Sequence, residues 1–159
     1  MCVIVDADVA ALVFGNPPHE DFLLVFNWLY DEQRNGVVVY GGHLTKELCE
    51  VGAVRRWLVR LNQAGRAYGF RDEEIDAEQR RVERMKLCRS DDPHVIALAR
   101  VSGARTLCSH NVHLYRDFKN KKLIDKPRGV IYRDARHEPL LRHTASCQRT
   151  RRRLSPGRS

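Results

Sequence analysis

The chain of 159 residues is long enough for one domain with a hydrophobic core and too short for two. Its 43% of hydrophobic residues is ordinary for a globular protein, no apolar run approaches the ~20 residues of a membrane span, and no signal peptide is visible, so we expect a cytoplasmic protein. The net charge of +8 favours a polyanionic partner, above all nucleic acid.

The positive charge is concentrated at the carboxyl end of the chain. Five of the 28 basic residues lie from Arg149 onward, where there is no acid, so the residues before them carry a net charge of only +3. We expect a folded domain over residues 1–142 and a basic, disordered tail over residues 143–159. The tail is a candidate nucleic-acid arm, with a partner-binding segment or a solubilising end as alternatives. Its candidate contacts are Arg149, Arg151, Arg152 and Arg153.

The five cysteines are odd in number and widely spaced, and no two of them form a C-x-x-C pair. This pattern argues against a disulfide framework and against a structural zinc site. We therefore expect reduced thiols, most of them buried.

Short β-branched runs alternate with amphipathic stretches along the chain. The first half predicts a strand over residues 2–5, helical turns over 8–14, a helix over 19–34, a strand over 37–40 and a helical stretch over 44–61 that breaks near Gly52. The second half predicts an edge strand over 67–70, helices over 72–87 and 92–102, a strand over 105–108, a helix over 111–118, a strand over 130–132 and a short helix over 137–141. This alternation predicts an α/β fold with a mostly parallel sheet of four or five short strands and helices on both faces.

Acidic side chains recur at one kind of position, where a predicted strand ends or the next helix begins. They are Asp6, Glu47, Asp91, Asp92 and Asp117. Because the carboxyl ends of parallel strands meet at one edge of a sheet, we expect these residues to converge there. Crowded carboxylates repel one another unless a cation lies between them, and oxygen ligands suit Mg²⁺ or Mn²⁺. A metal ion held in this way beside a basic surface is typical of enzymes that hydrolyse phosphodiester bonds.

Each of these acids also has a purely structural interpretation. Asp6 and Asp92 precede predicted helices and are suitable N-caps, Glu47 fits an exposed helix position, and Asp117 can pair with a neighbouring basic residue. Their recurrence at the same topological position favours the metal site. His94, beside Asp92 in the first turn of its helix, could approach a phosphate, but we expect it to be a surface histidine.

Four segments in order resemble the PIN-domain family of metal-dependent nucleases, and the resemblance covers the chain up to about Leu141. They are Val3-Ile4-Val5-Asp6-Ala7-Asp8, Thr45-Lys46-Glu47-Leu48, Asp92-Pro93-His94-Val95-Ile96-Ala97-Leu98-Ala99 and Leu107-Cys108-Ser109-His110-Asn111-Val112-His113-Leu114. The first resembles the opening strand of the family with its first acid, and the second resembles the helix that carries the second acid. The third resembles the D-A-x-I-x-A-x-A helix with the third acid, and the fourth resembles the stretch usually written L-x-S/T-x-D-x-x-L.

This resemblance implies a single PIN-like domain that hydrolyses phosphodiester bonds with Mg²⁺ or Mn²⁺, more often in RNA than in DNA. Matched position by position, Asp6, Glu47 and Asp92 fall on the metal-binding acids of the family, and Ser109 falls on the hydroxyl that supports the site. Small members of the family often act as toxin-type or defence ribonucleases. The resemblance therefore also implies an inhibitor or antitoxin protein and a homodimer as partners.

The chain departs from the family pattern at Asn111, where the pattern has an aspartate. An amide keeps a ligand oxygen but lacks the negative charge, which weakens both metal affinity and catalysis. Either Asp91 or Asp117 compensates, or the asparagine is a deliberate change that silences a toxic nuclease, or the chain is a weakened nucleic-acid-binding or regulatory module. The basic run near residue 120 adds candidate nucleic-acid contacts at Lys119, Lys121 and Lys122.

Overall fold

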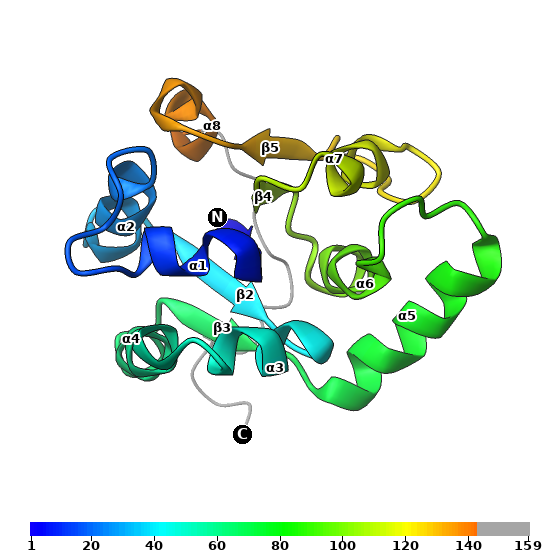
Figure 1. The fold of residues 1–159 in the computed structure, drawn as a ribbon, viewed down its shortest axis with the longest axis horizontal. Coiled ribbons are helices and arrows are strands. Elements are labelled where there is room, and N and C mark those ends of the chain that lie inside the picture. The colour runs from blue at the N-terminus through cyan, green and yellow to red at the C-terminus, as the bar shows by residue number, and fades with distance from the viewer. Residues whose placement is uncertain (143–159) are drawn as a thin grey trace.

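Five short strands form one all-parallel sheet in the order β3-β2-β1-β4-β5, in a computed structural model that describes residues 1–142 (Figure 1). The strands are β1 (Cys2–Val5), β2 (Val37–Tyr40), β3 (Ala67–Gly69), β4 (Thr106–Cys108) and β5 (Val130–Tyr132). All residues of β1 and β4 are buried, as expected for parallel strands that are covered on both faces. The predicted α/β class and its parallel sheet are confirmed.

Helices fill the connections between the strands. The first half of the chain forms α1 (Ala7–Val13), α2 (Leu23–Tyr30), α3 (His43–Cys49) and α4 (Gly52–Gln63). The second half forms α5 (Asp72–Met85), α6 (Pro93–Ser102), α7 (Val112–Lys119), the 3₁₀ turn η1 (Ala135–His137) and α8 (Pro139–Arg142). Crossovers between parallel strands are right-handed, so α1 to α4 cover one face of the sheet and α5 to α7 cover the other, as Figure 1 shows.

The direction in which the chain crosses the sheet reverses at β1. From β1 the chain moves outward to β2 and β3, then returns to the other side of β1 to form β4 and β5. A reversal of this kind leaves a crevice at the carboxyl ends of the two central strands, where open α/β sheets bind their ligands. Val5 of β1 pairs with Cys108 of β4, so the next residues, Asp6 and Ser109, enter this crevice side by side.

Helix α6 forms one wall of the crevice and is buried over all of residues 94–99. Pro93 begins the helix, where its missing N–H has no intrahelical partner to lose. Gly103 ends it at φ 78°, a left-handed conformation that glycine adopts without strain. Helix α6 packs along α5 on its own face of the sheet and touches α3 across the crevice.

The predicted helix boundaries shift by a few residues in the structure, and two helices differ in more than their ends. The helix expected over residues 19–34 covers only Leu23–Tyr30. The guanidinium of Arg66 donates to the carbonyl oxygens of Asp31 (3.0 Å) and Arg34 (2.6 Å), which holds the chain after α2 in a turn. The predicted short helix over 137–141 is instead the turn η1 followed by α8.

The expectation of reduced thiols throughout is wrong at Cys2, which is disulfide-bonded, whereas Cys49, Cys88 and Cys108 are free. Burial raises the pKa of the Cys88 thiol to about 11. Within residues 1–142, no helix is both long and apolar enough to cross a membrane. The predicted basic tail over 143–159 lies outside the described residues.

Candidate metal centre

A chain of hydrogen bonds joins four polar side chains at the carboxyl ends of β1 and β4. The Ser109 hydroxyl donates to Oδ2 of Asp6 (2.8 Å), and the backbone N–H of Asn111 donates to the Ser109 hydroxyl oxygen (3.0 Å). The side-chain amide of Asn111 then donates to Oδ2 of Asp92 (2.8 Å). Because Asp6 and Ser109 are buried, this chain is fixed relative to the sheet.

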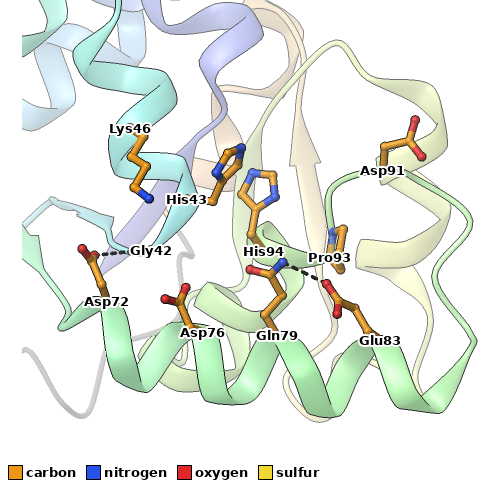
Figure 2. A pocket seen from close by; sticks show the side chains of 10 residues that line it. All are labelled: Gly42, His43, Lys46, Asp72, Asp76, Gln79, Glu83, Asp91, Pro93 and His94. Atoms are coloured by element: carbon orange, nitrogen blue, oxygen red, sulfur yellow. Dashed lines mark hydrogen bonds between the residues drawn. The ribbon is translucent and has the colours of Figure 1, made fainter.

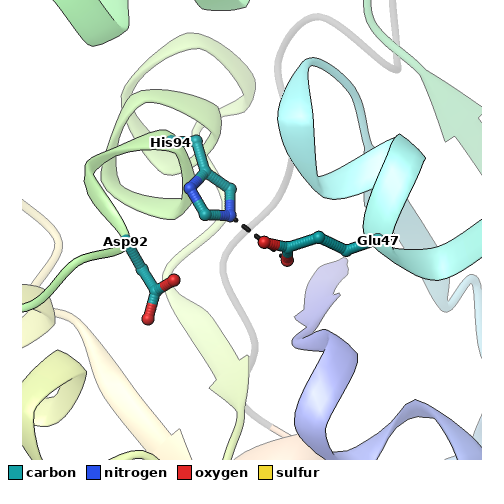
Figure 3. A group of neighbouring side chains, drawn as sticks. All are labelled: Glu47, Asp92 and His94. Atoms are coloured by element: carbon teal, nitrogen blue, oxygen red, sulfur yellow. Dashed lines mark hydrogen bonds and ion pairs between the residues drawn. The ribbon is translucent and has the colours of Figure 1, made fainter.

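Glu47, Asp92 and His94 meet across the crevice (Figure 3). Glu47 comes from α3, Asp92 immediately precedes α6, and His94 is its second residue. One ligand atom from each of the three lies within 4.8 Å of the other two. The His94 side chain is 4% exposed and the Glu47 side chain is 29% exposed, so the group opens to solvent on the side of α3.

The chemistry of these donors fits a divalent metal ion. Carboxylate oxygen and imidazole nitrogen are both common metal ligands, with bonds of about 2.0–2.2 Å. Because ligand atoms of Glu47, Asp92 and His94 all lie within 4.8 Å of one another, these three side chains could hold one ion between them. Asp6 lies beside this group and is joined to Asp92 through Ser109 and Asn111.

The Asp6 carboxyl is in an environment that disfavours its negative charge. Burial raises its pKa from the ordinary 3.8 to about 7, and the negative charges of Asp8 and Asp92 act in the same direction. The hydrogen bonds from Ser109 and from the Ala7 N–H oppose this shift only in part. A positive ion near Asp6 and Asp92 would remove the repulsion and favour the ionised carboxylates.

Asp92 does not act as the N-cap of α6. Although it occupies the capping position, its side chain makes no hydrogen bond to the first turn of that helix within the described residues, and its Oδ2 accepts instead from Asn111. The structural interpretation is thus wrong for Asp92, whereas Asp6 does accept a hydrogen bond from the Ala7 N–H at the start of α1 (2.8 Å). The Asp92 carboxylate therefore remains directed into the crevice, available as a ligand.

A cavity of about 370 Å³ opens beside this group, between α3, α5 and the start of α6 (Figure 2). His43 and His94 stand together on one side of it, with their rings packed edge to face at a centroid distance of 4.9 Å. Nε2 of His43 also lies 3.3 Å from Oε1 of Glu47, so His43 helps to orient that carboxylate. The charged residues that line the cavity are Lys46, Asp72, Asp76, Glu83 and Asp91. Asp91 therefore faces the cavity rather than the group of Glu47, Asp92 and His94.

Asp117 has a structural role away from this group. It is 2% exposed, and its carboxylate accepts hydrogen bonds of 2.6–3.1 Å from the N–H groups of Arg89 and Ser90 and from the Ser90 hydroxyl. These bonds hold the loop that leads into α6. These loop contacts account for the burial of Asp117. They take the place of the predicted pairing with a neighbouring basic residue and of the predicted compensation for Asn111 at the metal site.

The three lysines expected to bind nucleic acid lie away from the crevice. Lys119 ends α7, and Lys121 and Lys122 follow it, whereas Asn111 stands at the opposite end of the same helix. All three lysines are exposed. The tail arginines, Arg149, Arg151, Arg152 and Arg153, lie outside the described residues.

His94 is the residue at this site that the sequence-based prediction missed. The expectation of a surface histidine is wrong, because His94 is only 3% exposed. A signal was present in the sequence: the residues three and four positions further along the helix, Ala97 and Leu98, are both apolar, which places His94 on a buried face. His43 was also missed, although it lies four positions before Glu47 on α3, a spacing that brings two side chains together on one face of a helix.

Comparison with models of known protein families, with curated proteins and with solved structures found no match for this chain.

We expect Asp117→Asn to destabilise the protein without weakening metal binding. The amide would present N–H donors to the N–H groups of the loop at Arg89 and Ser90, and leaving buried donors unpaired costs about 1–3 kcal/mol each. Denaturant unfolding measures the loss of stability, and calorimetric titration with Mn²⁺ measures the affinity. A Mn²⁺ affinity that falls as much in Asp117→Asn as in Asp92→Asn would show that Asp117 is a ligand after all.

The raised pKa of Asp6 also predicts a pH dependence of stability in the presence of a chelator. The unfolded chain loses the Asp6 proton near pH 3.8 and the folded protein only near pH 7, so the free energy of unfolding falls as the pH rises between these values. Each unit of pKa difference corresponds to about 1.4 kcal/mol. We expect Asp6→Asn to lack this loss and to be more stable than the natural sequence at about pH 8. Glu50→Gln, which changes an exposed acid at the end of α3, is the control. Parallel pH profiles for Asp6→Asn and the natural sequence would contradict the prediction.

Proposed function

We propose that this protein is a divalent-metal-dependent endonuclease that hydrolyses phosphodiester bonds in RNA and acts in the cytoplasm. The observation that carries the proposal is the group of Glu47, Asp92 and His94 beside the buried Asp6, at the position in the sheet where α/β proteins bind ligands. The candidate ions are Mg²⁺ and Mn²⁺. A metal ion bound there would make a water molecule nucleophilic and neutralise charge on the scissile phosphate.

The protein side chains divide the work of such a site between them. Glu47 and Asp92 are the ligands, and both are partly exposed, so a phosphate group has access to them. Asp6 contributes a buried negative charge behind them, in an orientation set by Ser109. Asn111 fixes the Asp92 carboxylate by its amide hydrogen bond, which keeps that ligand in place before any ion arrives.

We also propose that the chain is a PIN-domain nuclease. Support comes from the order of the four resembling segments together with the way in which the parallel sheet brings Asp6, Glu47 and Asp92 to one edge. On this assignment the protein is a toxin-type or defence ribonuclease that is restrained by an inhibitor protein and forms a homodimer.

The overall charge supports a nucleic acid as the substrate. Residues 1–142 carry a net charge of +3 and the rest of the chain adds five arginines. Lys46 stands next to Glu47 in the sequence and lines the adjoining cavity, so it is positioned to contact a phosphate near the site. We assign contacts with phosphates further along the RNA to Lys119, Lys121, Lys122 and the tail arginines.

A second candidate function, a nucleic-acid-binding or regulatory module without catalysis, is favoured by one observation. The Asn111 amide donates to Asp92 and thereby replaces part of the stabilisation that a cation would give. A chain with this bond tolerates its crowded carboxylates better without metal than one with an aspartate at the same position.

A cleavage assay on RNA separates the two candidates. We expect end-labelled RNA to be cut in the presence of Mn²⁺ and to stay intact with a chelator. Asp92→Asn and Glu47→Gln should each lower the cleavage rate by at least about 100-fold, because metal assistance contributes several kcal/mol to the stability of the transition state.

Glu50→Gln is the matched control, since Glu50 is an exposed acid at the end of the same helix as Glu47. It should cut RNA at the rate of the natural sequence. Binding of Mn²⁺ and RNA without any cleavage would support the regulatory module, and equal cleavage by Asp92→Asn and the natural sequence would contradict the proposed site.

Asn111→Asp should increase both metal affinity and cleavage. The new carboxylate would retain the oxygen that caps α7 by accepting from the His113 and Leu114 N–H groups, but it would place a negative charge against Asp92 in place of a hydrogen-bond donor. We expect a lower melting temperature with a chelator and a larger increase on addition of Mn²⁺ than in the natural sequence. Thermal unfolding with and without Mn²⁺ measures both effects, and an unchanged Mn²⁺ response would count against a cation at Asp92.

A further inference from the structure

We infer that His94 is itself a metal ligand and that the centre selects a transition-metal ion, such as Mn²⁺, Fe²⁺ or Zn²⁺, over Mg²⁺. This inference rests on the proposed metal centre and extends it by naming a nitrogen ligand and the class of ion. Mg²⁺ is a hard cation that is bound through oxygen atoms and retains several of its water molecules. Imidazole nitrogen, by contrast, suits transition metals, so one histidine among the ligands changes the preference of the site.

The position of His94 fits a ligand because its ring is buried and packed. It belongs to the first turn of α6, directly after Pro93, and that helix is buried from His94 to Ala99. Its ring is packed edge to face on His43 and its Nε2 is directed at Glu47 (Figure 3). A buried imidazole in this position cannot turn toward solvent, so its nitrogen is preorganised at the edge of the crevice.

The distance between His94 and Glu47 also favours a shared ion. Nε2 of His94 lies 3.4 Å from Oε2 of Glu47, which is longer than the 2.7–3.2 Å of a typical N–H···O hydrogen bond. Two ligands of one tetrahedral ion with bonds of about 2.1 Å are about 3.4 Å apart. With Asp92 the group offers one nitrogen and two carboxylates, a set that leaves a coordination position for water.

The exposed histidine beside this group has a different role. The His43 side chain is 55% exposed and contacts the other carboxylate oxygen of Glu47, Oε1, at 3.3 Å. A group that holds a ligand in its binding orientation commonly tunes metal affinity without binding the ion. His43 is therefore a positioning residue for Glu47.

The alternative for His94 is a simple ion pair with Glu47, in which the imidazole is protonated and no metal is bound. The two arrangements make opposite predictions, because a metal ion competes with the proton on the imidazole. If His94 forms only an ion pair with Glu47, replacing His94 frees the Glu47 carboxylate and leaves the metal affinity of the site equal or higher. If His94 is a ligand, removing it lowers the affinity for transition metals selectively.

Calorimetric titration of the full, metal-free chain tests this selectivity. We expect tighter binding of Mn²⁺ and Zn²⁺ than of Mg²⁺. His94→Gln should lower the affinity for Mn²⁺ and Zn²⁺ by at least about 10-fold, because losing a group that only orients a ligand already lowers affinity by about that much. The Mg²⁺ affinity should change little. His113→Gln, which alters an exposed histidine at the start of α7, is the control and should leave all three affinities unchanged.

Pulsed electron paramagnetic resonance of bound Mn²⁺ tests the Mn–N contact directly, because a coordinated ¹⁴N nucleus modulates the electron spin echo. This modulation should be present in the natural sequence and in His43→Gln and absent from His94→Gln. Labelling the natural sequence with ¹⁵N-histidine should replace the ¹⁴N pattern, a result that needs no variant and stays valid if His94→Gln fails to fold.

Bound Mn²⁺ without histidine modulation, or an unchanged preference among the ions in folded His94→Gln, would overturn the inference. If either result is found and RNA is still cleaved, the proposed nuclease function is retained and only the assignment of His94 as a ligand is rejected. Modulation from His94 without RNA cleavage would support the inference and reject the nuclease.

Discussion

The burial of the Asp6 carboxyl beside other carboxylates is the constraint on which the rest of this site depends. The pairing of β1 with β4 buries Asp6, and the charge on Asp92 is near enough to raise its pKa further. The Ser109 hydroxyl and the Ala7 N–H donate to Asp6, and the Asn111 amide donates to Asp92. Neutral donors offset only part of the cost of bringing negative charges together. A cation would remove the repulsion between them.

The architecture around the crevice follows from the topology of the sheet. The reversal at β1 places α3 on one side of the crevice and α6 on the other, so that Glu47 and His94 face each other although 47 positions separate them in the chain. Asp117 contributes to the site indirectly, because it holds the loop at Arg89 and Ser90 that leads to Asp92. The site thus combines ligands on rigid helices with a loop that is fixed by a buried acid, and this combination preorganises it.

Much of this arrangement can be predicted from the sequence because it depends on local patterns. Runs such as residues 37–40 predict strands, the alternation with helices predicts a parallel sheet, and acids after strands predict convergence at one edge. The details that could not be predicted are tertiary. The capping position of Asp92 is a local property, but the Asn111 amide that draws its carboxylate away from the helix comes from another segment, 19 positions further along the chain. The loop contacts of Asp117 and the approach of His94 to Glu47 likewise depend on packing between distant elements.

Binding of a divalent ion between α3 and α6 is tested most directly by anomalous diffraction at the manganese edge from crystals soaked in Mn²⁺. The predicted result is a peak in contact with Glu47, Asp92 and His94. A peak confined to the neighbouring acidic cavity at Asp72 and Asp76, or no peak on this protein at all, would contradict it.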